Sequence, residues 1–135
     1  MILLAPVAHL RRRFPQGEAL EAWRQTDRLE VRNARTGQVL VHPYQFFQDF
    51  IEHEQELDPL RNVKELNSPV WVFHARDDAA VSPDEGRDLA AASRNGQFHL
   101  LSSGGHTLGT KEPWDSGEVS FELLEVTTTI LRELK

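Results

Sequence analysis

The pattern between Val70 and Leu101 limits the fold of this chain more than any other feature. The run Val70 to His74 is continuously apolar up to its last residue, as expected of a strand that is buried on both faces of a sheet. A second strand-like run, Gln97 to Leu101, follows after one helix length of sequence. Strands that alternate with helices form parallel sheets with right-handed crossovers. We therefore expect a parallel α/β core.

The segment between these two strands predicts a helix with a well-defined start. Ser82 can cap the helix, Pro83 suits the first helical position, and Glu85 would complete a capping box. The helix should run to about Arg94 and end at Asn95-Gly96, which suit a left-handed cap.

The remaining elements follow from the same periodicities of apolar residues. We predict a first strand at 2–5, a loop at 6–17, a helix at 18–27, hairpin strands at 28–31 and 38–41, a helix at 43–56, a polar lead-in before Val70, and a final helix at 118–134.

The predicted helix that begins at Pro43 carries a broad aromatic stripe. Tyr44, Phe47 and Ile51 recur at helical spacing, with Phe46 and Phe50 beside them. Such a stripe usually packs the helix and the hairpin onto the core, which is the reading we favour. The alternative is that it lines a pocket for an acyl or aromatic substrate.

Composition excludes several classes of function. The chain of 135 residues has a formal charge of −6, which argues against a nucleic-acid surface, and Arg11–Arg13 reads as a solvated turn. It has no cysteine, so disulfides and thiolate metal sites are excluded and the redox compartment stays open. No apolar run is long enough to span a bilayer. We expect a cytoplasmic protein with no membrane partner, no metal and no cofactor.

Acidic residues and a histidine follow the two predicted core strands. Asp77 and Asp78 come after the first, and His106 comes after the second, behind Gly104-Gly105. Functional groups often lie at the carboxyl ends of parallel strands, and an acid held in a fixed position there can orient an imidazole. The bland alternative is that Asp78 only turns the chain and that His106 is a surface loop residue.

The other histidines carry weaker signals. His53-Glu54 lacks the second histidine of a zinc-protease motif. We expect His9, His42 and His99 to be surface or packing residues, and His74 to pack or form a hydrogen bond at the end of a buried strand.

Three segments resemble the C-terminal half of an α/β-hydrolase, in particular the small serine esterases of the prolyl-oligopeptidase-like and dienelactone-hydrolase-like groups. "PVWVFHARDDAAVSP" is similar to the segment of that family that carries the triad acid, and "SSGGHTLG" to the segment that carries the triad histidine. "MILLAP" resembles the strand that follows the nucleophile helix. The resemblance implies Asp78 and His106 as catalytic residues. Ala75 replaces the usual glycine, Ser82 stands where proline is common, and Asp77 leaves the identity of the acid ambiguous.

The resemblance also implies an architecture. Residues 1–135 would form a single partial α/β-hydrolase domain with parallel strands and crossover helices. A helix–β-hairpin–helix excursion at about 18–56 would be a cap-like insertion. Because the apolar run begins at residue 1, we expect the chain to have been cut from something longer, with the first strand offering an unpaired edge for association.

The nucleophile that the resemblance calls for is missing. The family places it in a Gly-x-Ser-x-Gly elbow, and the context of every serine fails that pattern: Ser68, Ser82, Ser93, Ser102, Ser103, Ser116 and Ser120. We expect the elbow and the oxyanion-hole donors to lie upstream of Met1.

Two functions are therefore predicted. The first is the acid and histidine half of a serine hydrolase that acts on a carboxylic ester or amide, with a small-molecule ester or peptide as substrate. The second is a non-catalytic, truncated hydrolase-like module for binding or assembly. The partner in either case would be an N-terminal hydrolase half or a second copy of the chain.

Overall fold

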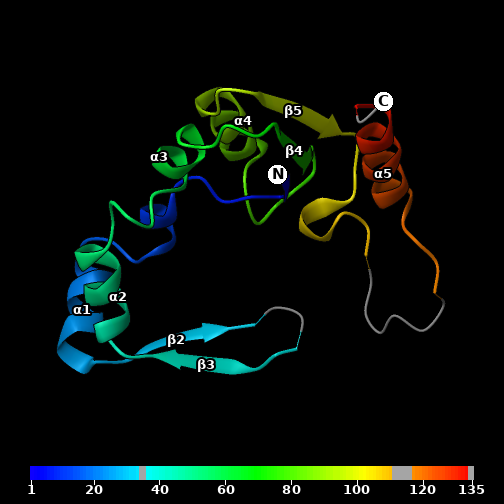
Figure 1. The fold of residues 1–135 in the computed structure, drawn as a ribbon. Coiled ribbons are helices and arrows are strands. Elements are labelled where there is room, and N and C mark those ends of the chain that lie inside the picture. The colour runs from blue at the N-terminus through cyan, green and yellow to red at the C-terminus, as the bar shows by residue number, and fades with distance from the viewer. Residues whose placement is uncertain (34–35, 111–116, 134–135) are drawn as a thin grey trace. The chain divides into compact units, whose positions relative to one another are not determined.

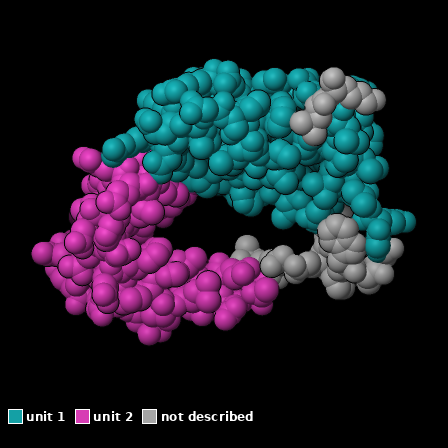
Figure 2. Space-filling view, in the orientation of Figure 1, with its two compact units in different colours: residues 1–8, 59–135 teal, residues 9–58 magenta. Residues whose placement is uncertain are grey.

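The computed structural model describes residues 1–33, 36–110 and 117–133. The chain divides into two compact units (Figure 2). The sheet unit consists of residues 1–8 together with residues 59 onward, and the hairpin unit is His9–Asp58. The predicted insertion at 18–56 falls within the hairpin unit. Leu134, the predicted end of the last helix, lies outside the described residues.

The sheet unit contains a parallel sheet of three strands, which confirms the α/β prediction. The strands are β1 (Ile2–Leu4), β4 (Val70–Ala75) and β5 (Gly96–Leu101), in the order β1-β4-β5. Figure 1 labels the neighbouring strands β4 and β5. Leu3 pairs with Val72, which in turn pairs with Phe98. The central strand β4 is hydrogen-bonded on both sides, so its carboxyl end has a fixed place beside that of β5.

One face of the sheet packs on two helices, α3 (Pro59–Lys64) and α4 (Pro83–Ala92). Val70 and Val72 of β4 are fully buried there, and the same cluster contains Ala8, Val63, Leu89 and Ala90. Complete burial of such a side chain is worth roughly 1.5–3 kcal/mol. This layer therefore anchors β4 from one side.

The opposite face packs on the last helix, α5 (Phe121–Glu133). Phe73 and Ala75 of β4 and Leu101 of β5 are buried against Val126 of that helix. The sheet is thus covered on both faces at β4, as the apolar run in the sequence predicted.

The start of α4 is confirmed, but its end is not where we predicted. The Ser82 hydroxyl accepts a hydrogen bond from the Asp84 N–H at 3.3 Å, and Pro83 begins the helix. The helix ends at Ala92, and Ser93 is extended, so the predicted left-handed cap at Asn95-Gly96 is wrong. The chain needs that stretch to enter β5, because the Asn95 carbonyl already accepts a hydrogen bond from the Val70 N–H at 2.9 Å.

Glu85 holds α4 to a segment distant in the sequence. Its side chain is buried, and Oε2 accepts a hydrogen bond from the Ala8 N–H at 2.9 Å. We had expected it only in a local capping box. A buried carboxylate requires such partners because the loss of water is costly.

Two helical segments differ from the sequence prediction. The polar lead-in contains helix α3, whose buried Val63 contributes to the core. A second difference is α2 (Gln45–Glu52), which is shorter than predicted and ends where the His53 N–H bonds to the Asp49 carbonyl at 3.1 Å. The residues that follow the two helices, 53–58 and 65–69, include few apolar side chains that would mark where each helix ends.

The hairpin unit builds an aromatic core of its own. Its elements are a 3-10 helix at Leu10–Arg13, inside the segment predicted as loop, then α1 (Glu18–Thr26), β2 (Leu29–Arg32), β3 (Val39–His42) and α2. The strands β2 and β3 are antiparallel. Residues 34–35, within the predicted turn, lie outside the described residues.

The aromatic stripe of α2 packs only in part as predicted, and it packs into the hairpin unit's own core. Phe47 and Phe50 are buried against Trp23 of α1, whereas Phe46 and Ile51 stay exposed. The indole N–H of Trp23 donates to the His42 carbonyl at 2.9 Å and ties α1 to the hairpin. Within the ranges described, no helix is long and apolar enough to cross a membrane.

Gly86 should be irreplaceable despite its place in the middle of α4. A Cβ atom there would lie 2.8 Å from His74 Nδ1 and 3.1 Å from the ring of Phe98. Alanine would otherwise favour a helix by roughly 1 kcal/mol. We predict that Gly86→Ala instead lowers the free energy of unfolding in urea by about 1–3 kcal/mol, the usual cost of overpacking. A stabilised variant would contradict the packing between α4 and β4.

The outer side of β1 should make the purified chain self-associate. Within the described residues β1 pairs only with β4, and Ile2 and Leu4 are 45% and 46% exposed. An apolar strand edge is a site for pairing with another chain. We predict concentration-dependent sedimentation at micromolar concentration, reduced by Leu4→Lys and unchanged by Val119→Lys, a change at an exposed residue outside both the sheet and α5. A stable monomer of the unaltered chain would contradict this prediction.

Candidate functional site

A tight turn after β4 holds Asp78 in a fixed position. The Asp78 N–H donates to the Ala75 carbonyl at 3.3 Å. Its own Oδ1 accepts from the N–H groups of Ala80 at 2.8 Å and Val81 at 2.9 Å. An aspartate that bonds the backbone two and three residues ahead stabilises a turn. The side chain is fully buried, so its direction is fixed by these bonds.

His106 meets Asp78 from the end of the neighbouring strand. It lies in a 3-10 helix at Gly105–Thr107, shortly after β5. Its Nδ1 is 3.0 Å from Asp78 Oδ2, and its side chain is 47% exposed. The spacing of the strand ends predicted this juxtaposition, and the structure shows it. The catalytic role of the pair remains a prediction.

Gly104 allows the chain to reach this position. Its φ is +118°, in the region that residues with a side chain rarely adopt. A Cβ atom there would also lie 2.8 Å from Glu122 Cγ. The turn that presents His106 therefore requires glycine at this point.

The structure separates the roles of the two adjacent acids. Asp78 faces His106, whereas Asp77 Oδ1 accepts a hydrogen bond from the Gly105 N–H at 2.9 Å. Asp77 thus holds the loop that carries His106, one residue away from the imidazole. Alignment of the sequence favoured Asp78 as the acid, and the geometry agrees with that choice.

His74 is a third member of this cluster. It is fully buried, and its Nε2 lies 3.0 Å from both Asp78 Oδ2 and the Val81 carbonyl oxygen. Both partners are acceptors, so Nε2 carries the proton and donates. Its Nδ1 is buried and finds no hydrogen-bond partner in the described part of the chain. We had expected His74 to pack or form a hydrogen bond, but its contact with Asp78 was not foreseen.

The pKa of Asp78 is lowered from its usual value. Burial acts to raise it, but hydrogen bonds from the Val81 N–H, from His106 and from the Ala80 N–H outweigh burial. The carboxylate is therefore charged at neutral pH, and it must accept the hydrogen bond from His106. In the neutral form of the ring this sets the tautomer of His106, with the proton on Nδ1 and the lone pair on Nε2.

An imidazole held in this way can move a proton at Nε2. The charged Asp78 orients the ring and stabilises the imidazolium that forms when Nε2 accepts a proton. Such an arrangement is compatible with general-base chemistry. Among the described residues no hydrogen bond reaches His106 Nε2.

The hydroxyls of several serines are engaged elsewhere. Ser103 donates to Glu122 at 2.9 Å, Ser120 donates to the Leu108 carbonyl at 2.7 Å, and Ser82 caps α4. Ser116 lies outside the described residues. These three hydroxyls therefore form hydrogen bonds away from the ring of His106.

His99 is a packing residue, as predicted: its ring stacks on that of Phe73, with the ring centroids 4.7 Å apart. Over the ranges 1–33, 36–110 and 117–133, no cluster of three or more His, Cys, Asp or Glu side chains could hold a metal ion.

No protein-family model matches this sequence, and no curated protein matches it. The resemblance to α/β-hydrolases thus rests on the segments quoted above.

Asp78→Asn should cost much more stability than Asp77→Asn. The first change removes a buried charge that accepts four hydrogen bonds, and the second alters one bond at the surface. Hydrogen bonds to charged groups are worth more than neutral ones, so we expect a loss of about 2 kcal/mol for Asp78→Asn at pH 7. Urea unfolding of both variants measures the difference. Equal losses of unfolding free energy in the two variants would contradict the assignment of Asp78 as the buried acid that accepts four hydrogen bonds.

The loss of unfolding free energy caused by Asp78→Asn should depend on pH. A carboxyl whose pKa is lower in the folded state adds stability above its unfolded pKa, and this is lost as the pH falls through the folded pKa. We therefore expect the gap in unfolding free energy between the unaltered chain and Asp78→Asn to shrink as the solution is acidified below the ordinary carboxyl range.

Proposed function

We propose that this chain provides the acid and the histidine of a serine hydrolase that acts on a carboxylic ester or amide. The single observation that supports the proposal is the hydrogen bond of 3.0 Å between Asp78 Oδ2 and His106 Nδ1 at the carboxyl ends of adjacent parallel strands. In this reading the sheet unit is the C-terminal portion of an α/β-hydrolase fold, and the hairpin unit contains the cap-like insertion.

Each residue would have a distinct role. His106 Nε2 would take the proton from a serine hydroxyl as that oxygen attacks the substrate carbonyl, and would return it to the leaving group. Asp78 would orient the ring and stabilise its cation. The serine and the oxyanion-hole donors would come from a polypeptide outside residues 1–135.

A second candidate, a non-catalytic assembly module, is favoured by a different observation. Apolar side chains of β1 and α5 are exposed, among them Ile2, Leu4, Phe121 and Leu124. Exposed apolar surface of this kind marks interaction sites. A proton-accepting histidine has no evident use in such a module, so we place the hydrolase first.

The proposal is tested by activity and by labelling. The purified chain should neither hydrolyse p-nitrophenyl esters nor react with a fluorophosphonate probe. A polypeptide extended by the reading frame upstream of Met1 should do both. In the extended protein His106→Ala should lower turnover by about six orders of magnitude, and Asp78→Ala by about four, as in other serine hydrolases.

A matched control distinguishes catalysis from folding. Asp77→Asn alters the neighbouring acid but keeps an oxygen that can accept the Gly105 N–H, so the loop that carries His106 stays in place and we expect the variant to retain most of the turnover. Probe labelling of a serine in residues 1–135, with hydrolysis that depends on His106, would overturn the assignment of the nucleophile. An upstream reading frame without a Gly-x-Ser-x-Gly elbow, together with an inactive extended protein, would favour the assembly module.

A further inference from the structure

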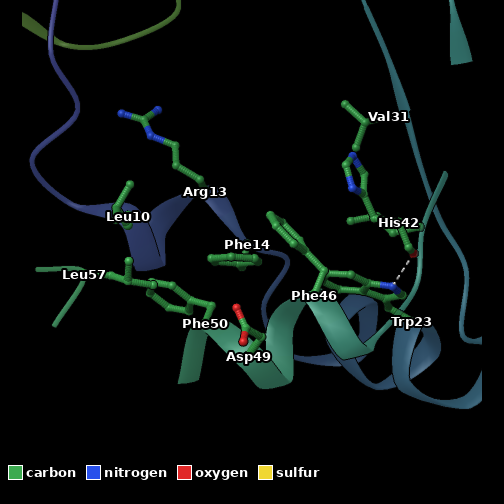
Figure 3. A pocket seen from close by; sticks show the side chains of 11 residues that line it. Leu10, Arg13, Phe14, Trp23, Val31, His42, Phe46, Asp49, Phe50 and Leu57 are labelled. Carbon is green, nitrogen blue, oxygen red and sulfur yellow. Dashed lines mark hydrogen bonds between the residues drawn. The ribbon is translucent and has the colours of Figure 1, made fainter. Parts of the chain in front are cut away.

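The hairpin unit encloses a pocket of about 470 Å³ (Figure 3). Every residue that lines it belongs to this unit, so the pocket is complete without the sheet unit that carries Asp78 and His106. Its walls come from the 3-10 helix, α1, the hairpin, α2 and the segment after α2. Ligand pockets in proteins commonly have volumes of about 300–1,000 Å³.

The floor of the pocket is aromatic. Trp23 and Phe50 line it and are buried, and the ring of Phe14 lies between those of Phe50 and Phe46 (Figure 3). The ring of Phe14 is centred 4.6 Å from that of Phe50 and 5.7 Å from that of Phe46. Rings at these separations pack favourably and leave faces and edges for a further ring.

The rim of the pocket is apolar but open to solvent. Phe46 is 52% exposed, and Val31 and Leu57 are also exposed. The imidazole of His42 lies against Phe46, with the two rings centred 5.2 Å apart. A buried aromatic floor beneath an exposed apolar rim leaves surface that a ligand can remove from water.

The polar groups of the pocket limit the charge of a ligand. The Trp23 N–H already donates to the His42 carbonyl, so the floor presents ring carbon in place of a donor. The two formally charged lining residues are Arg13 and Asp49, whose charges offset each other. The carboxylate of Asp49 is largely exposed and lies 3.4 Å from His53 Nδ1. The lining therefore has no excess charge to select an ion.

We propose that this pocket binds an uncharged small molecule that is mainly aromatic or branched aliphatic. The volume admits a ligand of one or two fused rings, the floor offers aromatic contacts, and the balanced charge favours a neutral molecule. A second protein copy fits less well, since a concave site walled by five segments would need a protruding side chain to fill it. The binding site does not depend on the hydrolase proposal.

The neutral fluorophore N-phenyl-1-naphthylamine provides a direct test on the whole chain. We expect saturable binding of one probe per chain in the micromolar range, with energy transfer from Trp23. Phe46→Ala should weaken binding at least tenfold, because it removes an exposed wall of the pocket with little effect on folding. Ile51→Ala, on the same helix and outside the pocket lining, should leave affinity unchanged.

A second variant tests whether weaker probe binding in Phe46→Ala could result from misfolding. Val31→Trp places a bulky side chain at the rim and should block the probe while the unfolding midpoint is preserved. Absence of saturable binding, or equal loss in Phe46→Ala and Ile51→Ala, would overturn the proposal. So would sedimentation showing a dimer whose formation excludes the probe, because the occupant would then be a second copy.

Discussion

The carboxylate of Asp78 is the interaction on which the local structure depends. Its four hydrogen bonds come from the Ala80 and Val81 N–H groups, from His74 and from His106. Each oxygen accepts two, so the group has little capacity left for water. A buried carboxylate would be costly without such partners, and with them it is a fixed negative charge. The turn, the buried histidine and the exposed histidine are therefore all held by one side chain.

The parallel sheet determines why these groups meet. β4 is buried on both faces and paired on both sides, so its carboxyl end is among the most constrained points of the sheet unit. The end of β5 lies beside it in register. Asp77 then ties the loop after β5 to the turn after β4 through the Gly105 N–H. The backbone thus fixes the relative position of Asp78 and His106, and the proposed proton transfer would require such positioning.

Much of this arrangement could be predicted from local sequence. The continuous apolar run of β4, the capping serine of α4 and the acid and histidine after successive strands are local signals, and the structure shows each of them. The contact between His74 and Asp78 was missed, because it depends on how the turn folds back beneath the strand. The partner of Glu85 was also missed, since Ala8 is far away in the sequence. The pocket of the hairpin unit likewise requires the packing of several segments.

The central claim is that a charged Asp78 holds His106 with its proton on Nδ1 and a lone pair on Nε2. Long-range ¹H–¹⁵N correlation spectra of the histidine rings, recorded at a pH where they are neutral, measure this directly. The account predicts the Nδ1–H tautomer for His106 and the Nε2–H tautomer for His74, with His106 losing its fixed tautomer in Asp78→Ala. An Nε2–H tautomer for His106 in the unaltered chain would contradict it.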